Sequence, residues 1–348
     1  MNSTERLCRL TLLILLLPIA LHAQVPFYQG KTITVIVSSD AGGTSDIRVK
    51  SLMPYLQKNI PGNPTILVEY MPGGGGRKAA NHVFRTVKPD GLTIGSMGTT
   101  LLAAAIQGES GVLYDLSKFI YLGSSDATTQ HIFSTRKEIG LTNLEKLRAV
   151  PALRIGAQSI GHNIYITGRL FAYFLSLTDP RMVVGYSGPE VDLALLRGEV
   201  DARSSLIASI VQRTPEWVDK KLVDFHAVFE TPKGNRHPRF AHLPELEMFA
   251  KSDRERKVLE LQRAIRLGGS AIVLPPNTPR DRVEILQGAM RKALNDPGFS
   301  ANFRKLVGED PTPLMPEELQ KVIQDVPREP EVVALFNKIA GGDRLPER

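Results

Sequence analysis

The sequence predicts an α/β protein that folds into two lobes, each with its own β-sheet. Three observations support this prediction. Strands, glycine-containing loops and helices alternate over residues 31–100, and the same alternation begins again near Ser124. Alternating elements of this kind form mostly parallel sheets. The chain of 348 residues is also long enough for two domains with well-buried cores.

The first expected unit is a strand over residues 31–37, a loop and a helix over residues 46–59. Alternate residues from Ile33 onward are apolar, and Ile36 makes the strand apolar on both faces, as a buried central strand requires. The loop contains a Gly-Gly pair, which a simple tight turn would also use. Unpaired N–H groups at the start of a helix attract negative charge, so this corner is a candidate anion site.

Two similar units follow. A strand over residues 65–69 leads into four glycines and a helix over residues 78–87, and a strand over residues 92–96 leads into a Gly-Thr-Thr loop. The glycine run is not a P-loop, because Arg77 stands where a P-loop has its last glycine. Arg77 and Lys78 either contact an anionic ligand or are solvated at the start of a helix. In open α/β sheets ligands bind beyond the carboxyl ends of the strands, where all three loops fall.

The second half of the chain repeats this order, with loops rich in Gly, Ser and Asn. One helix has Thr142 as its expected N-cap and Glu145 three residues later, the pattern of a capping box. Two sheets whose loops face one another would enclose a cleft. Strands are expected over residues 130–135, 154–157, 182–185, 200–204, 222–229 and 270–274, and helices over residues 142–150, 164–175, 191–197, 253–267, 280–295, 298–306 and 316–326.

The N-terminus has the pattern of a cleavable secretory signal peptide over residues 1–23. Arg6 and Arg9 precede an apolar run over residues 10–17, which is too short to span a membrane. Export of the protein is therefore expected. Cys8 is the only cysteine of the chain and lies in this segment, so the mature protein is expected to have no disulfide.

The composition argues against several function classes. The formal charge is +7, but basic and acidic residues are interspersed and only 6% of residues are aromatic, so a nucleic-acid-binding face is not expected. A hydrolase is not favoured, because there is no Gly-x-Ser-x-Gly elbow and the mature part has no cysteine. The spacing of His237 and His242 does not suit a helical metal-binding pair. We therefore expect neither an enzyme nor a metal or cofactor.

Several stretches, taken in order, carry a family resemblance. They are ITVIVSSDAGGTSD, PTILVEYMPGGGGRKAAN followed by KPDGLTIGSMGTT, RIGAQSIGHN, VVGYSGPEVDLALLRGEVDA, HLPELEMFA and VLPPNTPRDRVEILQGAMRKALNDPGFSANF. Together they resemble the Bug-type periplasmic binding proteins, the solute receptors of tripartite tricarboxylate transporters. The resemblance covers nearly the whole chain after the signal peptide.

The resemblance implies a type II periplasmic binding fold, in which two α/β lobes close on a small carboxylate-bearing solute. It implies a monomeric periplasmic receptor that passes its solute to membrane permease subunits, with no nucleic-acid partner and no cofactor. The implied division of the chain is a signal peptide over residues 1–23, a first lobe from residues 24–124 and 229–348, and a second lobe from residues 125–228. A sensor that signals to a two-component kinase would need the same cleft, and the sequence leaves both uses open.

The resemblance also implies which residues contact the ligand, mainly through backbone N–H groups, hydroxyls and bridging waters. In the first lobe these are Ser38, Ser39, Gly42, Gly43, Thr44, Asp46, Gly74, Gly75 and Thr99. In the second lobe they are Ser159, Gly161, His162, Tyr186, Ser187, Gly188 and Asp201.

Four sites near the expected cleft depart from the family pattern. Ser38-Ser39 stands where the family has Pro-Phe, and Tyr70-Met71 stands where it has Asn-Arg. His162 stands where the family commonly has serine, and Tyr165 stands where it commonly has histidine. These departures bear on the ligand and not on the fold. His162 has two interpretations, a pH-sensitive donor to a carboxylate or a residue that caps a helix.

Overall fold

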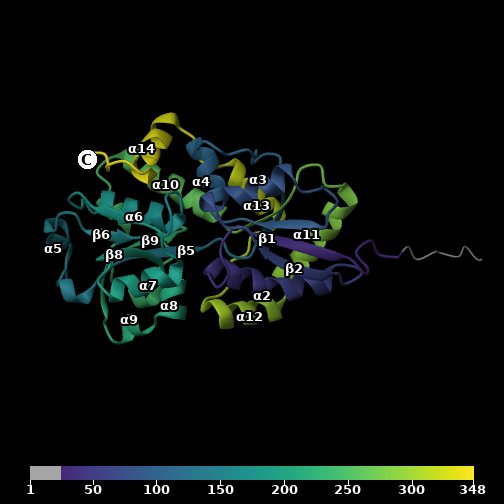
Figure 1. The fold of residues 1–348 in the computed structure, drawn as a ribbon, viewed down its shortest axis with the longest axis horizontal. Helices are drawn as coiled ribbons and strands as arrows, with labels where there is room; N and C mark the ends of the chain where they lie inside the picture. Colours follow the sequence, from purple (N-terminus) through teal and green to yellow (C-terminus); the bar gives the residue numbers. More distant parts are fainter. Residues whose placement is uncertain (1–24) are drawn as a thin grey trace, which may run out of the picture.

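The computed structural model describes residues 25–348, so the signal peptide expected over residues 1–23 lies outside the described residues. The chain forms two five-stranded sheets, each surrounded by helices (Figure 1). The two sheets lie in separate lobes that stand side by side. This confirms the predicted two-lobed α/β fold.

The first sheet has the strand order β2-β1-β3-β10-β4. β2 and β3 pair in parallel with β1, and β10 runs antiparallel between β3 and β4. Its strands are β1 (Thr32–Val37), β2 (Thr65–Tyr70), β3 (Thr93–Ser96), β4 (Ile120–Ser124) and β10 (Ala271–Leu274). The helices of this lobe are α2 (Thr44–Asn59), α3 (Arg77–Arg85), α4 (Thr100–Gln107), α11 (Arg280–Leu294), α12 (Pro297–Val307) and α13 (Pro316–Gln324), and the glycine run forms the short 3-10 helix η1 (Gly74–Gly76).

The second sheet has the strand order β7-β6-β8-β5-β9. β7 and β8 pair in parallel with β6, and β5 runs antiparallel between β8 and β9. Its strands are β5 (Thr129–Arg136), β6 (Arg154–Gly156), β7 (Arg181–Val183), β8 (Ala202–Leu206) and β9 (Val223–Thr231). The helices nearby are α5 (Leu144–Ala149), α6 (Asn163–Phe174), α7 (Gly188–Leu196), α8 (Ile207–Arg213), α9 (Glu216–Asp219), α10 (Asp253–Leu267) and α14 (Pro330–Ala340), with 3-10 helices η2 (Lys137–Ile139), η3 (Pro238–Phe240) and η4 (Leu246–Phe249).

Each sheet contains one antiparallel strand, and that strand enters from the other lobe. β5 follows β4 of the first sheet, and β10 follows β9 of the second sheet after α10. The parallel strands of each sheet end at the edge that faces the other lobe. A strand that enters at this edge must run in the opposite direction, which explains why the sheets are mixed although mostly parallel sheets were predicted.

The expected N-cap of α5 is wrong. Asn143 and not Thr142 is the N-cap, because its side-chain oxygen accepts the N–H of Lys146 at 2.9 Å. Asn is as good an N-cap as Thr, so the choice between neighbours depends on where the preceding turn ends. Here Thr142 donates its N–H to the carbonyl of Gly140 and belongs to that turn.

The apolar core has one part that spans both lobes. Helices α3, α4, α6, α10 and α14 lie on one side of the sheets (Figure 1), and their buried side chains form a single cluster. α14 packs against α4 of the first lobe and against α6 and α10. Two further clusters on the other side each lie mainly within one lobe.

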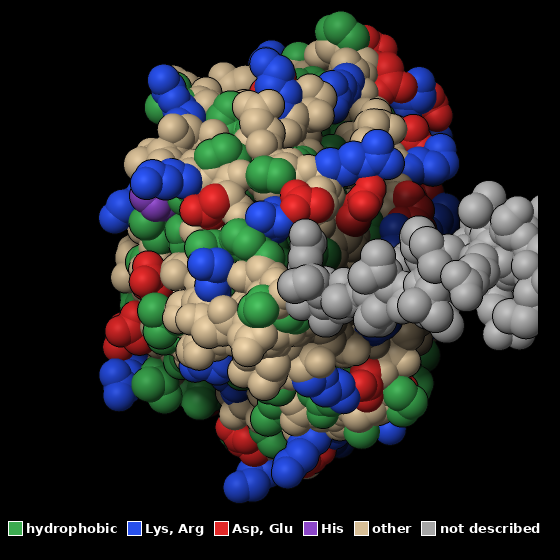
Figure 2. Space-filling model, turned by 90° about the vertical axis from the view of Figure 1, so that its right-hand side faces the viewer, with side chains coloured by type: hydrophobic (Ala, Val, Ile, Leu, Met, Phe, Trp, Pro, Cys, Tyr) green, Lys and Arg blue, Asp and Glu red, His purple; other side chains and the backbone are tan. Residues whose placement is uncertain are grey.

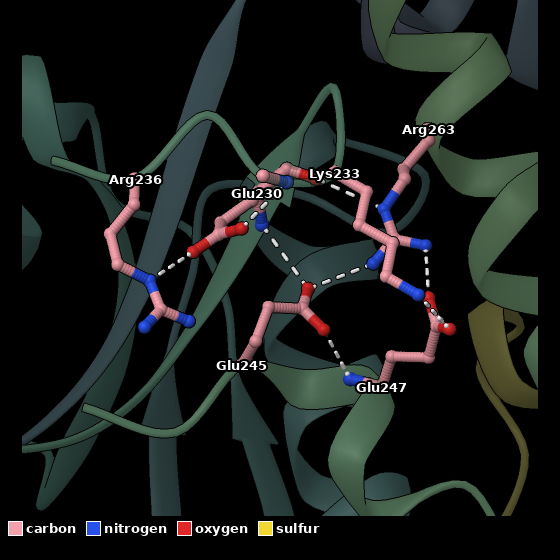
Figure 3. Close-up of polar contacts among 7 residues, drawn as sticks. Glu230, Lys233, Arg236, Glu245, Glu247 and Arg263 are labelled. Atoms are coloured by element: carbon pink, nitrogen blue, oxygen red, sulfur yellow. Dashed lines mark hydrogen bonds and ion pairs between the residues drawn. The ribbon is translucent and has the colours of Figure 1, made fainter. Parts of the chain in front are cut away.

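The second connection between the lobes is fixed by charged side chains (Figure 3). Arg263 of α10 donates to Glu245 at 2.8 Å and to Glu247 at 2.6 Å, and its Nε donates to the carbonyl of Glu230 in β9 at 3.0 Å. The remaining cations of this network are Lys233 and Arg236. The network ties the end of β9 to the helix that precedes β10.

Charges of both signs are mixed on the face of the molecule drawn in Figure 2. No helix within residues 25–348 is both long and apolar enough to cross a membrane. The same residues contain no group of three or more His, Cys, Asp or Glu side chains that could hold a metal ion.

Candidate functional site

Three loops of the first lobe lie together where its parallel strands end. Ser38, just after β1, accepts the N–H of Gly98 on its Oγ at 3.1 Å. A Cβ added to Gly76 would lie 3.2 Å from Thr100 Oγ1 and 3.4 Å from Ser38 Cβ, and Gly76 has a φ of +100°, so a side chain is disfavoured there. The hydroxyl of Ser39 is buried without a partner among the described residues. Ser38, Gly76, Gly98 and Thr100 therefore lie together where β1, β2 and β3 end.

Asp46 holds the turn that precedes α2. Its carboxylate is 1% exposed and accepts the N–H of Gly42 at 2.8 Å, the Tyr70 hydroxyl at 2.6 Å and Lys50 Nζ at 2.8 Å. Burial opposes ionisation, but these hydrogen bonds outweigh it and lower the pKa of Asp46. Asp46 therefore positions the Gly42-Gly43 turn, in which Gly43 is the N-cap of α2.

His162 is the N-cap of α6. Its Nδ1 accepts the backbone N–H of Ile164 at 3.2 Å. The backbone N–H of His162 donates to the carbonyl of Ser159 across the turn that contains Gly161. Desolvation of the ring and the positive charge of Arg266 lower the pKa of His162 to about 4. The ring is therefore neutral near pH 7 and carries its proton on Nε2, which is left to donate.

The loop after β7 lies beside the loop after β6. Gly185 donates its N–H to the carbonyl of Gln158 at 2.7 Å. Tyr186 follows in this loop, Ser187 is the N-cap of α7 and Gly188 is its first residue. Because β6 and β7 are parallel, both loops lie at the edge of the second sheet that faces the first lobe.

The structure does not bring Asp201 to this edge. Asp201 directly precedes β8, at the opposite end of the parallel strands, and bonds Arg154 Nε at 2.8 Å and Nη2 at 2.7 Å. A second arginine, Arg136, lies 3.3 Å from the same carboxylate. The predicted ligand contact is corrected to an ion pair that joins the starts of β6 and β8 to the end of β5.

The two lobes meet through predicted site residues. Thr44 Oγ1 lies 3.0 Å from Ser209 Oγ of α8 and accepts from Arg213 Nη1 at 3.4 Å. A Cβ added to Gly75 would lie 3.6 Å from the carbonyl oxygen of Gly161. The loops predicted in separate halves of the chain thus face one another across the junction.

Two buried arginines at this junction were not predicted. Arg266 of α10 is 5% exposed and donates Nη1 to Thr99 Oγ1 at 2.9 Å and Nε to Thr129 Oγ1 at 3.1 Å, so it contacts both lobes. Arg48 of α2 is 6% exposed and pairs with Asp126 through Nη2 and Oδ2 at 2.5 Å. Burial, together with the charge of Arg48, lowers the pKa of Arg266 to about 9.

His131 lies next to these arginines. It is fully buried in β5, two residues after Thr129 and thus on the same face of the strand. Its Nε2 is 2.8 Å from Asn163 Nδ2, and because an amide N–H only donates, Nε2 accepts and the proton sits on Nδ1. Burial and the charges of Arg266 and Arg48 keep the pKa of His131 well below its usual range. Nδ1 has no partner within residues 25–348.

Two cavities lie away from the junction. One, of about 580 Å³, lies between α6 and residues 342–348, and the other, of about 710 Å³, lies between the end of α4 and α14. In the first cavity Arg169 donates to the carbonyl of Asp343 at 2.6 Å, and Arg348 pairs with Glu255 at 2.8 Å. The charged groups there hold the C-terminal segment onto α6.

Comparisons with known proteins bear on the fold. No family model and no curated protein matches the chain. Among solved structures it is similar to the periplasmic binding protein BugD, with 21% identity and a TM-score of 0.68 over 90% of this chain and 99% of that one. The chain has the fold of a periplasmic binding protein.

Two other solved structures that are similar to this chain contain malate or adipate. MatC from Rhodopseudomonas palustris with bound malate is 21% identical, with a TM-score of 0.65 over 89% of this chain and 99% of that one. The R. palustris protein Rpa4515 with adipate is 18% identical, with a TM-score of 0.67 over 89% of this chain and 97% of that one.

The loops at the junction of this fold are predictable from the sequence, but its charged residues are not. Arg48, His131 and Arg266 all lie in predicted helices or strands and not in loops. One signal was present for Arg266, which follows Gln262 and Leu259 at helical spacing. A position on the apolar stripe of an amphipathic helix indicates burial, and a buried arginine needs a reason to be there.

Proposed function

We propose that the chain is a Bug-type periplasmic receptor that closes its two lobes on a small carboxylate and delivers it to a tripartite tricarboxylate-type permease. The observation that supports this most directly is the convergence of Arg48, Arg266 and the buried donor His131 where the two lobes meet. Malate and adipate, named with two proteins of the same fold, are both small dicarboxylates.

The proposal includes a cleaved signal peptide over residues 1–23, a periplasmic location and a monomeric receptor that leaves its solute chemically unchanged. The site at the junction suits binding, because its groups are donors and cations held rigidly by helices and strands. Neither a nucleophile nor a general base is needed to hold a carboxylate between two lobes.

Thermal unfolding of residues 24–348 in the presence of a carboxylate panel tests the proposal. A carboxylate at a hundred times its dissociation constant stabilises the folded state by about 2.7 kcal/mol, which is about 4 °C in melting temperature for a chain of this length. The panel contains malate and adipate, and the matched controls are their neutral diamides. We expect at least one acid to raise the melting temperature and its diamide to leave it unchanged.

A shift caused by a sugar, an amine or a metal ion, with none from any acid, would contradict the carboxylate assignment. Mass spectrometry of the ligand recovered after incubation provides the second check. Conversion of the bound acid into a product would contradict a receptor role.

A further inference from the structure

We propose that the guanidinium of Arg266 is the charged contact for one carboxylate group of the solute, with the Nδ1–H of His131 and the guanidinium of Arg48 beside it. The inference rests on the proposed function and deepens it. It assigns the recognition of the acid group to a side-chain cation and not only to backbone N–H groups and hydroxyls.

A comparison within one helix shows what Arg266 lacks. Arg263 lies three residues earlier on α10 and pairs with two carboxylates, those of Glu245 and Glu247 (Figure 3). Arg266 is buried to the same degree, but its acceptors are the neutral hydroxyls of Thr99 and Thr129. Within residues 25–348 no ion pair joins it to an acidic side chain, and the acid beside it, Asp126, is paired with Arg48. A buried charge without a counter-ion is costly, so the protein keeps it at the expense of stability.

The neighbouring acids do not supply the missing negative charge. Asp126 is occupied, because Oδ2 pairs with Arg48 and Oδ1 accepts from Thr312 Oγ1 at 2.7 Å. Glu309 forms no ion pair with Arg266 in the described part of the chain, and burial and the charge of Asp126 raise its pKa. Because Asp126 neutralises the charge of Arg48, the positive charge of Arg266 has no counter-ion of its own in the described part of the chain.

Hydrogen-bond donors are also left over at this place. Arg48 Nε and His131 Nδ1 are both buried and have no partner within the described part of the chain. Their neighbourhood follows from the start of β5, because Arg48 pairs with Asp126 just before this strand, Arg266 donates to Thr129, and His131 lies two residues after Thr129 on the same face. A carboxylate is the group that accepts only, offers two oxygens and carries the opposite charge. It would satisfy both the surplus charge and the surplus donors.

The position of Arg266 also links binding to closure. Thr99 belongs to the loop after β3 in the first lobe, and Thr129 begins β5 of the second sheet. A carboxylate held by Arg266 would therefore lie at the point where elements of both lobes meet. Binding energy gained there favours the closed arrangement over an open one.

Arg266→Gln tests the inference, because Gln still donates to a threonine hydroxyl but carries no charge. Affinities are measured by calorimetry for malate and adipate, using residues 24–348. We expect at least about a 30-fold loss of affinity for whichever of the two acids the unmodified protein binds, as for other buried charged contacts. Arg266→Lys keeps the charge without the planar fork and is expected to lose less.

The control is Arg256→Gln, which removes an exposed arginine from the same helix and is expected to leave affinity unchanged. The melting temperature without ligand separates binding from structure. We expect Arg266→Gln to melt at or above the temperature of the unmodified protein, because an unpaired buried charge is removed. A structural role for Arg266 predicts a lower melting temperature.

The outcomes are distinguishable. If the unmodified protein binds malate or adipate and Arg266→Gln binds the same acid within threefold, the inference is wrong and the proposed function stands. If the unmodified protein binds no acid of the panel, the proposed function fails and the inference fails with it. If Arg266→Gln does not fold, the Arg266→Lys variant is measured instead. An affinity of Arg266→Lys within threefold of that of the unmodified protein, together with a lower melting temperature without ligand, would assign Arg266 a structural role only.

Discussion

The buried ion pair between Arg48 and Asp126 gives the sharpest stability prediction. Their side chains are 8% and 5% exposed, and the Asp126 carboxylate lies 2.5 Å from Arg48 Nη2. Asp126→Asn keeps the shape of the side chain and removes the negative charge that faces Arg48. Breaking a buried pair by removing one partner costs about 3–5 kcal/mol, because the other charge is left uncompensated. We expect the free energy of unfolding to fall by that amount.

Urea unfolding of a double-mutant cycle measures the effect. Arg48→Met removes the cation instead, and the double variant removes both charges. We expect the double variant to be more stable than Asp126→Asn alone by at least about 1 kcal/mol, since no unpaired charge from this pair remains. Asp310→Asn is the matched control, because its partner Arg304 is exposed and an exposed pair is worth about 0–1 kcal/mol.

Two results would refute this reasoning. A loss below about 1 kcal/mol for Asp126→Asn would show that water or a rearrangement compensates Arg48. Additive effects of the two single substitutions would show that the two side chains do not stabilise one another.

Two further predictions concern pH and backbone conformation. Burial lowers the pKa of His226 to about 4 in the folded state, below its unfolded value of about 6.5, so the stability that is present above pH 6.5 is lost as the pH falls. We expect His226 to lower the free energy of unfolding by about 2 kcal/mol between pH 7 and pH 5. Urea unfolding of His226→Gln at both pH values should show a decrease that is smaller by this amount. Gly42 has a φ of +80°, which a side chain disfavours, whereas Gly43 has a φ of −81° and is the N-cap of α2. Gly42→Ser should therefore lower the free energy of unfolding by about 1–2 kcal/mol, and Gly43→Ser should leave it unchanged. Equal decreases in melting temperature for the two variants would contradict this.

The fold was largely predictable because its elements are marked locally. Apolar alternation and glycine loops identify β1, β2 and β3, and their order indicates a sheet. β4 was missed because Ile120–Ser124 is a short, nearly continuous apolar run that is followed by another strand and not by a glycine loop and a helix. α14 was missed for a different reason, since its apolar face is explained only by the two lobes it packs between.

The site was predictable only in part. Glycines and hydroxyl residues identify a loop by their effect on the backbone, which is a local property. Arg266 is distinguished by its hydrogen-bond partners in the described part of the chain, which are hydroxyls and not carboxylates, and this depends on how α10 packs against both lobes. The misplacement of Asp201 has a similar origin, because its neighbours in sequence do not say at which end of the second sheet it lies.

The core that α14 shares with both lobes has a mechanical consequence. On that side the lobes are joined through apolar side chains of α4, α6 and α14, and water cannot replace such contacts without a cost. On the opposite side they meet mainly through polar groups, the hydroxyls of Thr44 and Ser209 and the amide of Gln212 with the Leu306 carbonyl, for which water is a good substitute, and Ala208 adds a small apolar contact. We expect the lobes to separate first on the side of α2, α8 and α12 and to pivot on α14. A solute would then enter from the polar side, and a label at the C-terminus, which is fixed to α6, would move with the second lobe.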